Sequence, residues 1–320
     1  MRIAITGGDG LLGRHVAQLL ETRGEEVVRV SRRRGVNLSD PAQLRAAFEG
    51  CDSVVHAAGI NRELGIQTFR SVHIEGTANV ISAARAAGVQ RLVFVSFLRA
   101  RPRCGSPYHE SKWQAEELVR GSGLDYTVIK PGIVYGPGDH MLDHLSRSIR
   151  TFPLFALPGA RDFPMRPMAA ADAASVIAAA CTDPRLSRRT VAMVGPEEMT
   201  LRGAVERVAA AQALPVRFVR LPIWFHRFLA ALFELMMAVP LIARAQVRIL
   251  SESLAEPLPP CDSLPDDLQP RLLLEADRIR VAKPHPEPFG LTDLRCCARK
   301  TATSSFMSGG GDKRFGWPKS

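Results

Sequence analysis

A glycine-rich turn near the N-terminus constrains this chain more than any other feature. Residues 1–6 form a short apolar run, and glycines follow at positions 7, 10 and 13. Residues 12–20 then continue with the apolar spacing of a helix. A strand, a glycine-rich turn and a helix in this order present helix N–H groups and the positive end of the helix dipole to phosphates. We therefore predict a nucleotide site at this turn, with a purely structural strand–helix junction as the alternative.

Each glycine of the turn has a predicted role. Gly7 permits the tight turn, Gly10 lets a pyrophosphate approach the backbone, and Gly13 lets the helix pack closely on the strand. The residues of this turn that we expect to contact the cofactor are Gly7, Gly8, Asp9, Gly10, Leu11, Leu12 and Gly13.

Strand-like and helix-like segments alternate through the first half of the chain. The predicted strands are 26–31, 53–58, 91–96 and 126–130, and the predicted helices are 40–48, 73–87 and 108–121. Strands that are nearly continuous in apolar residues are typical of a parallel sheet covered on both faces. Right-handed crossovers then give an α/β fold, a doubly wound Rossmann sheet with its ligand at the carboxyl ends of the strands.

The second half of the chain is less regular. Residues 131–167 are rich in proline and glycine and predict loops and short elements, while 255–290 carry many prolines and predict an extended segment. We predict helices at 172–182 and 201–212 and a strand at 190–194. The predicted domains are a Rossmann domain of 1–135 and about 165–197, a smaller C-terminal substrate or partner lobe of about 136–164 and 198–295, and a disordered tail of 296–320.

Residues 224–239 form a strongly apolar stretch, interrupted by His226, Arg227 and Glu234. The stretch is too short and too interrupted for a membrane span. It predicts a buried helix of the second lobe, with contact to a membrane surface or a partner protein as the alternative.

Charge and cysteine content narrow the classes of function. The formal net charge is +10, from 42 basic and 32 acidic residues, which favours anionic ligands or an anionic surface. No aromatic–basic motif accompanies that charge, so we do not expect nucleic-acid binding. Six scattered cysteines without a C-x-x-C pair predict reduced thiols and no metal site. The chain starts directly with a core strand, so we expect a cytoplasmic protein, with membrane association left open.

A tyrosine and a lysine four residues apart carry candidate chemistry. Tyr108 and Lys112 lie on one face of the predicted helix, and Ser96 ends the strand before it. A lysine ammonium beside a phenol is expected to lower the phenol pKa from about 10 toward a useful range for acid–base catalysis. Ser96 would hydrogen-bond a substrate oxygen. These residues favour carbonyl reduction or alcohol oxidation, against a solvated helix that merely carries the two side chains.

With these residues in view, the chain resembles the atypical or extended short-chain dehydrogenases/reductases of the NAD-dependent epimerase/dehydratase type. The matching segments are Thr6-Gly7-Gly8-Asp9-Gly10-Leu11-Leu12-Gly13, His56-Ala57-Ala58-Gly59, Glu75-Gly76-Thr77-Ala78-Asn79-Val80, Val95-Ser96, Tyr108-x-x-x-Lys112 and Lys130-Pro131-Gly132-Ile133-Val134-Tyr135-Gly136-Pro137-Gly138-Asp139. They cover about residues 1–195. The stretch from Tyr108 to Glu117 also resembles the branch related to an accessory subunit of respiratory complex I.

The resemblance implies catalytic and cofactor-binding roles. Tyr108 would be the general acid/base, Ser96 the partner of the substrate oxygen, and Lys112 the residue that binds the nicotinamide ribose and tunes Tyr108. The hydride chemistry belongs to the cofactor, while the protein supplies geometry and a proton. The further residues expected beside the cofactor are Ala57, Ala58, Gly59, Pro131, Gly132 and Val134.

Two positions depart from the family pattern. The family's helix asparagine, which helps to relay a proton, aligns with His73. A histidine can also relay protons, and a histidine satisfied by packing is the alternative. The polar stretch usual in the later lobe is reduced to residues 169–172, where Asp172 is expected to be only a helix cap.

The end of the second predicted strand bears on the choice of cofactor. NAD-preferring proteins place an acidic residue about twenty positions after the glycines. Here Ser31 occupies that position, and Arg32 or Arg33 could hold a 2′-phosphate. We therefore predict that the cofactor is NADP, with NAD as the alternative. The alternative for the arginines is a solvated basic loop that binds no ligand. Asn37 and Leu38 are expected beside the adenine.

These observations predict an oxidoreductase or epimerase that transfers a hydride between NADP and a small carbonyl, alcohol or sugar-like substrate. The alternative is a non-enzymatic nucleotide-binding scaffold or sensor, associated with a respiratory or membrane complex. The sequence is also compatible with a homodimer.

Overall fold

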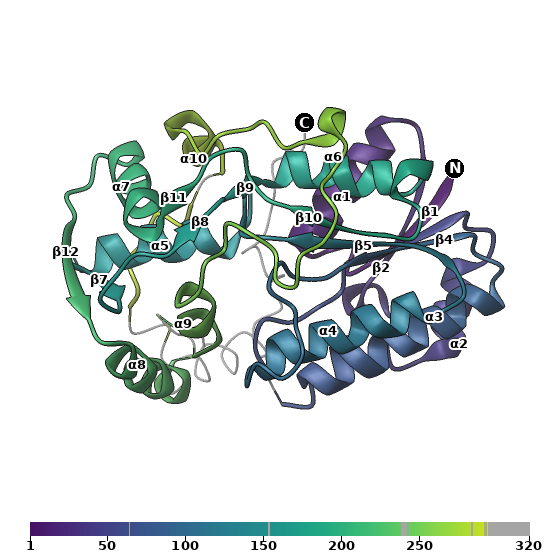
Figure 1. Cartoon of the computed structure of the whole chain (residues 1–320), viewed down its shortest axis with the longest axis horizontal. Helices are drawn as coiled ribbons and strands as arrows, with labels where there is room; N and C mark the ends of the chain where they lie inside the picture. Colours follow the sequence, from purple (N-terminus) through teal and green to yellow (C-terminus); the bar gives the residue numbers. More distant parts are fainter. Residues whose placement is uncertain are drawn as a thin grey trace, which may run out of the picture.

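The central feature of the computed structural model is a sheet of six parallel strands in the order β2-β1-β3-β4-β5-β10 (Figure 1). The structure describes residues 1–63, 65–152, 154–237, 242, 244–282, 284–290 and 293. The strands are β1 (Arg2–Thr6), β2 (Glu26–Val30), β3 (Ser53–His56), β4 (Arg91–Val95), β5 (Asp125–Pro131) and β10 (Arg189–Met193). The chain turns to opposite sides of β1 to form β2 and β3, which makes the sheet doubly wound, as predicted.

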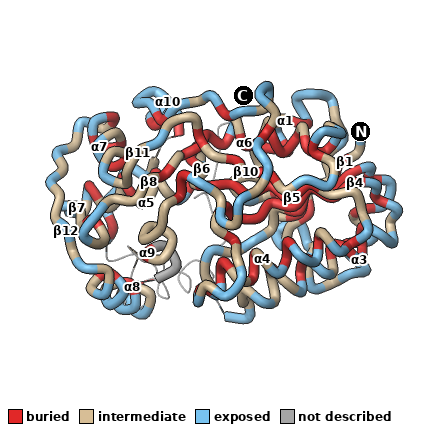
Figure 2. The backbone as a smooth tube through the Cα atoms, viewed as in Figure 1, coloured by how far each residue is buried: buried red, intermediate tan, exposed pale blue. Residues whose placement is uncertain are grey.

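Helices cover both faces of this sheet. One face carries α1 (Leu11–Thr22) and α6 (Ala170–Ala180), and the other carries α2 (Pro41–Phe48), α3 (Gly76–Ala86) and α4 (Pro107–Arg120) (Figure 1). Successive strand residues face opposite layers, so Ile5 packs with α1 and α6 while Ala4 packs with the other helices. Figure 2 shows the sheet as the most deeply buried part of the chain.

The helix predicted at 73–87 begins differently from the expectation. Its first turn is π-helical (η2, Arg70–Glu75), and α3 continues from Gly76. The π-turn contains the buried His73. Single π-turns of this kind are frequent at functional sites.

A second lobe packs beside the carboxyl ends of the strands (Figure 1). Its core includes Tyr135, Leu142, Met165 and Val205. The remaining elements are β6 (Val134–Tyr135), α5 (His140–Thr151), β7 (Leu154–Pro158), β8 (Pro164–Met165), β9 (Met168–Ala169), β11 (Met199–Thr200), α7 (Leu201–Ala211), β12 (Arg217–Leu221), α8 (Ile223–Met236), α9 (Arg244–Leu250) and α10 (Ala276–Ala282), with short 3-10 turns η1 (Arg32–Arg34), η3 (Pro184–Leu186) and η4 (Asp266–Leu268).

Helix α5 lies where the sequence predicted loops. The Asp139 carboxylate accepts the Leu142 N–H at 2.7 Å and caps the helix. Leu142, Leu145 and Ile149 recur at helical spacing and are buried. The sequence analysis missed this helix because the surrounding residues 131–167 are rich in proline and glycine, which favour loops.

The proline-rich segment after residue 255 runs back along the sheet domain. Asp172 in the first turn of α6 accepts the N–H groups of Arg271 and Leu272, each at 2.8 Å. The expectation that Asp172 is only a helix cap is therefore wrong, because Ala169 is the N-cap of α6 and the Asp172 carboxylate anchors this segment. The predicted tail 296–320 lies outside the described residues.

Of the apolar stretch 224–239, residues 224–236 belong to helix α8, which is not buried as predicted, and residues 238 and 239 lie outside the described residues. In α8 only His226 and Ala230 are buried, whereas Trp224 is 68 % and Leu235 is 73 % exposed. The helix packs at the outer edge of the second lobe, where a single helix can shield one side only (Figure 2). Within the described part of the chain, no helix is long and apolar enough to span a bilayer.

Candidate functional site

The glycine-rich turn joins β1 to α1 in a conformation that needs glycine. Gly7 has φ +70°, and a Cβ atom added there would lie 2.8 Å from the Ala58 Cα atom. A Cβ atom at Gly13 would lie 2.2 Å from the Gly7 carbonyl oxygen. Gly10 is the N-cap of α1 and provides no side-chain cap for its first N–H groups. These N–H groups are suited to bind a phosphate.

A pocket of about 590 Å³ opens beside this turn at the carboxyl ends of β1, β2 and β3. Of the predicted cofactor residues, those that line it are Gly7, Asp9, Gly10, Ser31, Arg32, Arg33, Asn37, Leu38, Ala58 and Gly59. The lining residues that sequence reasoning missed are Val30, Val36, Ser39, Ile60, Ile66, Gln67, Ser71 and Val72. Ile60 directly follows the predicted Ala57-Ala58-Gly59 segment, but residues 66–72 belong to no motif that could have pointed to them.

A carboxylate from the glycine-rich turn reaches the end of β2. The Ser31 hydroxyl donates a hydrogen bond to Asp9, and Arg34 pairs with the other Asp9 oxygen at 3.4 Å. The hydrogen bond from Ser31 is the main reason that the pKa of Asp9 lies below its usual range. The β2 end, which lacks an acidic residue in the sequence, thus gains a negative charge from the turn, next to the exposed Arg32 and Arg33.

The opposite end of the pocket leads toward helix α4. Gly59 lines the pocket, and a Cβ atom added there would lie 3.1 Å from Lys112 Nζ and 3.5 Å from His73 Nε2. Lys112 donates to the Val95 carbonyl oxygen at 3.1 Å, and burial lowers its pKa to about 8. The lysine ammonium therefore lies where the pocket meets the tyrosine helix.

Tyr108 is enclosed by aromatic rings. Phe69, His73, Phe97 and His109 each make an edge-on contact with its ring, at centroid distances of 5.3 to 5.8 Å. Burial raises the pKa of the Tyr108 phenol well above its usual range. The expected lowering by Lys112 is absent in this state, because loss of hydration opposes the phenolate form.

The Ser96 hydroxyl, which was predicted to hydrogen-bond a substrate oxygen, is bonded to another side chain in this structure. Its hydroxyl donates to the buried Glu116 carboxylate at 2.5 Å. Glu116 also accepts from Arg120 at 2.7 Å and lies 3.4 Å from Lys130 Nζ. A buried carboxylate is a strong hydrogen-bond acceptor. The Ser96 hydroxyl therefore belongs to the network around Glu116.

His73 is held by hydrogen bonds at both ring nitrogens. Nε2 accepts the Ile60 N–H at 3.1 Å, so the proton is on Nδ1, which donates to the Ser111 hydroxyl at 2.9 Å. Burial lowers the pKa of His73 to about 2. In this state a neutral His73 joins the loop after β3 to α4, which fits the packing role better than the proton relay.

A second buried histidine ties β1 to the π-turn. The Thr6 hydroxyl lies 2.6 Å from His56 Nδ1, and His56 Nε2 lies 3.0 Å from the Thr77 hydroxyl. Thr77 donates to the His73 carbonyl oxygen at 2.5 Å, so its oxygen accepts from His56 Nε2. Burial lowers the pKa of His56 to about 3, so the whole chain of hydrogen bonds is neutral. These bonds join β1 and β3 to η2 and α3.

The other predicted cofactor residues lie outside the pocket lining. Gly8 donates to the Val30 carbonyl oxygen at 3.3 Å, and Gly132 donates to the Met193 carbonyl oxygen at 2.9 Å. The residues in this group are Gly8, Leu11, Leu12, Gly13, Ala57, Ser96, Tyr108, Lys112, Pro131, Gly132 and Val134. Most of them belong to the predicted nicotinamide half of the site. The open pocket thus corresponds to the predicted adenosine and phosphate half.

A family comparison decides what this arrangement belongs to. The sequence model of the NAD dependent epimerase/dehydratase family matches residues 3–195, which include the whole central sheet. The chain belongs to the NAD dependent epimerase/dehydratase family. Membership confirms the short-chain dehydrogenase/reductase resemblance and supports an NAD-dependent enzyme.

Proteins similar to this chain include two reductases and a solved epimerase. A ceramide reductase from Caulobacter vibrioides is 29 % identical over 244 residues, which cover 69 % of this chain and 73 % of that protein. A 2-alkyl-3-oxoalkanoate reductase from Stenotrophomonas maltophilia is 29 % identical over 176 residues, covering 44 % and 53 %. The UDP-glucose 4-epimerase of Thermus thermophilus, solved in complex with NAD, is 21 % identical with a TM-score of 0.63, covering 88 % and 97 %. At that identity the solved structure supports the fold alone.

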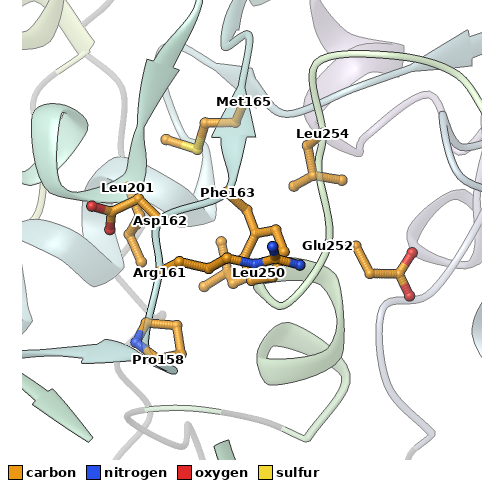
Figure 3. A pocket seen from close by; sticks show the side chains of 9 residues that line it. All are labelled: Pro158, Arg161, Asp162, Phe163, Met165, Leu201, Leu250, Glu252 and Leu254. Atoms are coloured by element: carbon orange, nitrogen blue, oxygen red, sulfur yellow. The ribbon is translucent and has the colours of Figure 1, made fainter.

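The second lobe adds a constriction next to α9. Figure 3 shows the residues that line a small space here, among them Arg161, Phe163 and Met165, with Leu250 at the end of α9 and Glu252 and Leu254 just after it. The space between them is about 10 Å³, close to the size of one water molecule.

Three arginines bind Glu252, and two of them, Arg99 and Arg101, come from the loop after β4. The partners are Arg99, Arg101 and Arg248, at 3.5, 2.8 and 3.0 Å. In the part of the chain that the structure describes, no group of three potential metal ligands occurs.

Proposed function

We propose that the protein binds NADP(H), in preference to NAD(H), and reduces a small carbonyl substrate or oxidises the matching alcohol. The observation that carries this proposal is the position of Gly59. This residue lines the pocket beside the glycine-rich turn and also packs against Lys112 on the tyrosine helix. A cofactor that follows the pocket wall from the glycine-rich turn would reach Lys112.

The residues of the pocket fit a phosphorylated dinucleotide. The uncapped N-terminus of α1 and the turn at Gly7 suit the pyrophosphate. Arg32 and Arg33 at the other end suit a 2′-phosphate, and Asn37 and Leu38 suit the adenine. The cofactor, when bound, supplies the hydride.

Tyr108 supplies the proton in the proposed reaction. Because burial keeps its phenol protonated, Tyr108 is ready to donate to a carbonyl oxygen during reduction. The Lys112 ammonium would bind the ribose hydroxyls and, once cofactor and substrate exclude water, stabilise the phenolate that remains. Ser96 would take part only after its hydroxyl leaves Glu116.

The relatives favour reduction within this family. Two of them are named reductases, of a ceramide and of a 2-alkyl-3-oxoalkanoate. We therefore favour a small carbonyl or alcohol as the substrate, with a sugar-like substrate as the alternative.

The test is turnover by the full-length protein. With NADPH and a panel of ketones and aldehydes, we expect NADPH oxidation, and thermal stabilisation by NADPH greater than by NADH. Tyr108→Phe is expected to lose at least ~100-fold in turnover while keeping the NADPH stabilisation. Tyr126→Phe, a change in β5, is the matched control. Turnover that survives Tyr108→Phe would sink the assigned role.

A non-enzymatic nucleotide-binding scaffold is the second candidate. Two observations favour it: Ser96 is held by Glu116, and His73 has both nitrogens engaged in packing. Such a protein would bind NADPH, turn over no carbonyl of the panel, and co-purify with a stable protein complex. Turnover without any stable partner would decide against it. Light scattering of the full-length protein would measure its mass in solution and so test the separate prediction of a homodimer.

A further inference from the structure

Helix α8 presents an apolar face to solvent. Trp224, Phe228 and Leu235 are 68, 61 and 73 % exposed, and Leu232 and Met236 are also exposed. Their spacing of four, eight, eleven and twelve residues from Trp224 places them on one side of the helix. Exposed apolar side chains that form a continuous stripe mark an interaction surface, whereas single ones do not.

The opposite side of α8 fixes this orientation. His226 is buried, with Nε2 3.2 Å from the Ala156 carbonyl oxygen of β7, and Ala230 is fully buried. The helix therefore contacts the lobe through a histidine and a small residue. Its large apolar side chains face outward.

The exposed charges on α8 and in the strand before it are basic. Arg227 is exposed between Trp224 and Phe228, while Glu234 is only partly exposed. Strand β12, which leads directly into α8, adds the exposed Arg217, whereas its Arg220 is paired with the Asp162 carboxylate at 2.6 Å. Together with the net charge of +10, these cations complement an anionic surface.

We propose that α8 docks the protein onto an anionic lipid bilayer. The helix would lie in the plane of the headgroups, with Trp224, Phe228 and Leu235 at the acyl boundary and Arg227 at the phosphates. Fourteen residues span about 21 Å, which suits a helix that lies flat and is too short to cross. Tryptophan is enriched at this depth of a membrane. This surface does not depend on the proposed activity.

The test is flotation of the full-length protein with vesicles. We expect it to float with vesicles of phosphatidylcholine and phosphatidylglycerol, and less with phosphatidylcholine alone or at high salt. Trp224→Ser/Phe228→Ser/Leu235→Ser should lower partitioning by about tenfold or more. Val281→Ser removes an exposed apolar side chain of α10, which is 68 % exposed, and should float like the wild type.

Two results would overturn the proposal. One is a wild-type protein that stays in solution with anionic vesicles, or a triple variant that floats as well as the wild type. The other is a wild-type dimer that the triple variant converts to a monomer without any vesicle binding, because a second copy then covers the face. If the triple variant does not fold, quenching by brominated lipids decides instead. Trp224 fluorescence should be quenched in the wild type, and this component should be missing in Trp224→Phe.

Discussion

The Ser31 hydroxyl donates a hydrogen bond to the Asp9 carboxylate, which places a negative charge from the glycine-rich turn at the end of β2. The position that carries an acid in NAD-preferring proteins thus holds a serine bonded to an acid. Arg34 balances part of this charge at 3.4 Å. Asp9 and the neighbouring arginines are therefore expected to have opposite effects on the binding of a 2′-phosphate.

Asp9→Asn should increase the affinity for NADPH relative to NADH. Removing one charge near the 2′-phosphate is expected to shift the ratio of the two dissociation constants by about tenfold, or about 1.4 kcal/mol. Fluorescence titration of each reduced cofactor measures the ratio. Asp277→Asn makes the same charge change on the exposed α10 and should leave the ratio unaltered. A ratio that moves toward NADH in Asp9→Asn contradicts the assignment.

Arg32→Ser/Arg33→Ser should have the opposite effect. Loss of two exposed cations from the pocket is expected to weaken NADPH binding by about tenfold and NADH binding far less. The difference should shrink at high salt, because exposed charges are screened. Arg23→Ser, at the end of α1, is the control. Equal losses for both cofactors would show that the arginines do not contact a 2′-phosphate.

Lys112→Met should stabilise the fold while it abolishes cofactor binding. Burial lowers the pKa of Lys112 to about 8 from 10.5, so at pH 7 the folded state bears a charged group that it disfavours. Between pH 8 and 10.5 the lysine is still protonated in the unfolded chain but largely neutral in the folded protein. The penalty that Lys112 imposes on the folded state therefore shrinks, and stability rises, across this range. Removal of the buried charge in Lys112→Met should raise the free energy of unfolding at pH 7, and loss of the hydrogen bond to Val95 should offset part of this gain. We expect a net increase of about 2 kcal/mol.

Urea denaturation at about pH 7 and about pH 10 checks this expectation. The gain should be smaller at the higher pH, where the wild-type lysine is largely neutral in the folded state. Lys130→Met is the contrasting variant, because Lys130 pairs with the buried Glu116 and its loss should destabilise. A Lys112→Met protein that is less stable than the wild type at neutral pH would refute the argument.

Glu116→Gln should destabilise the sheet domain strongly. Glu116 is fully buried and accepts from Ser96 and Arg120 beside Lys130. Its neutralisation leaves the buried Lys130 ammonium without a counter-charge, which costs about 3–5 kcal/mol. The neighbouring Glu117 pairs with Arg120 but is 53 % exposed, so Glu117→Gln should cost less than about 1 kcal/mol. Equal losses in urea denaturation would contradict the structural role of Glu116.

Local sequence was sufficient for much of this molecule. The positive φ of Gly7 is a local constraint of the turn, and apolar periodicity located the strands of the central sheet. The pocket also lies at the edge where the sequence predicted a ligand, because the carboxyl ends of adjacent parallel strands meet there.

Long-range contacts decided the rest. The sequence alone determined the α/β class, the nucleotide turn and the placement of Tyr108 and Lys112 on one helix, since each rests on spacing along a short segment. Only the tertiary structure decided that Ser96 bonds to Glu116, that Asp9 reaches Ser31, and that the apolar side of α8 faces outward. A hydroxyl bonds to whichever acceptor the fold brings near, and a helix exposes whichever side its neighbours leave uncovered.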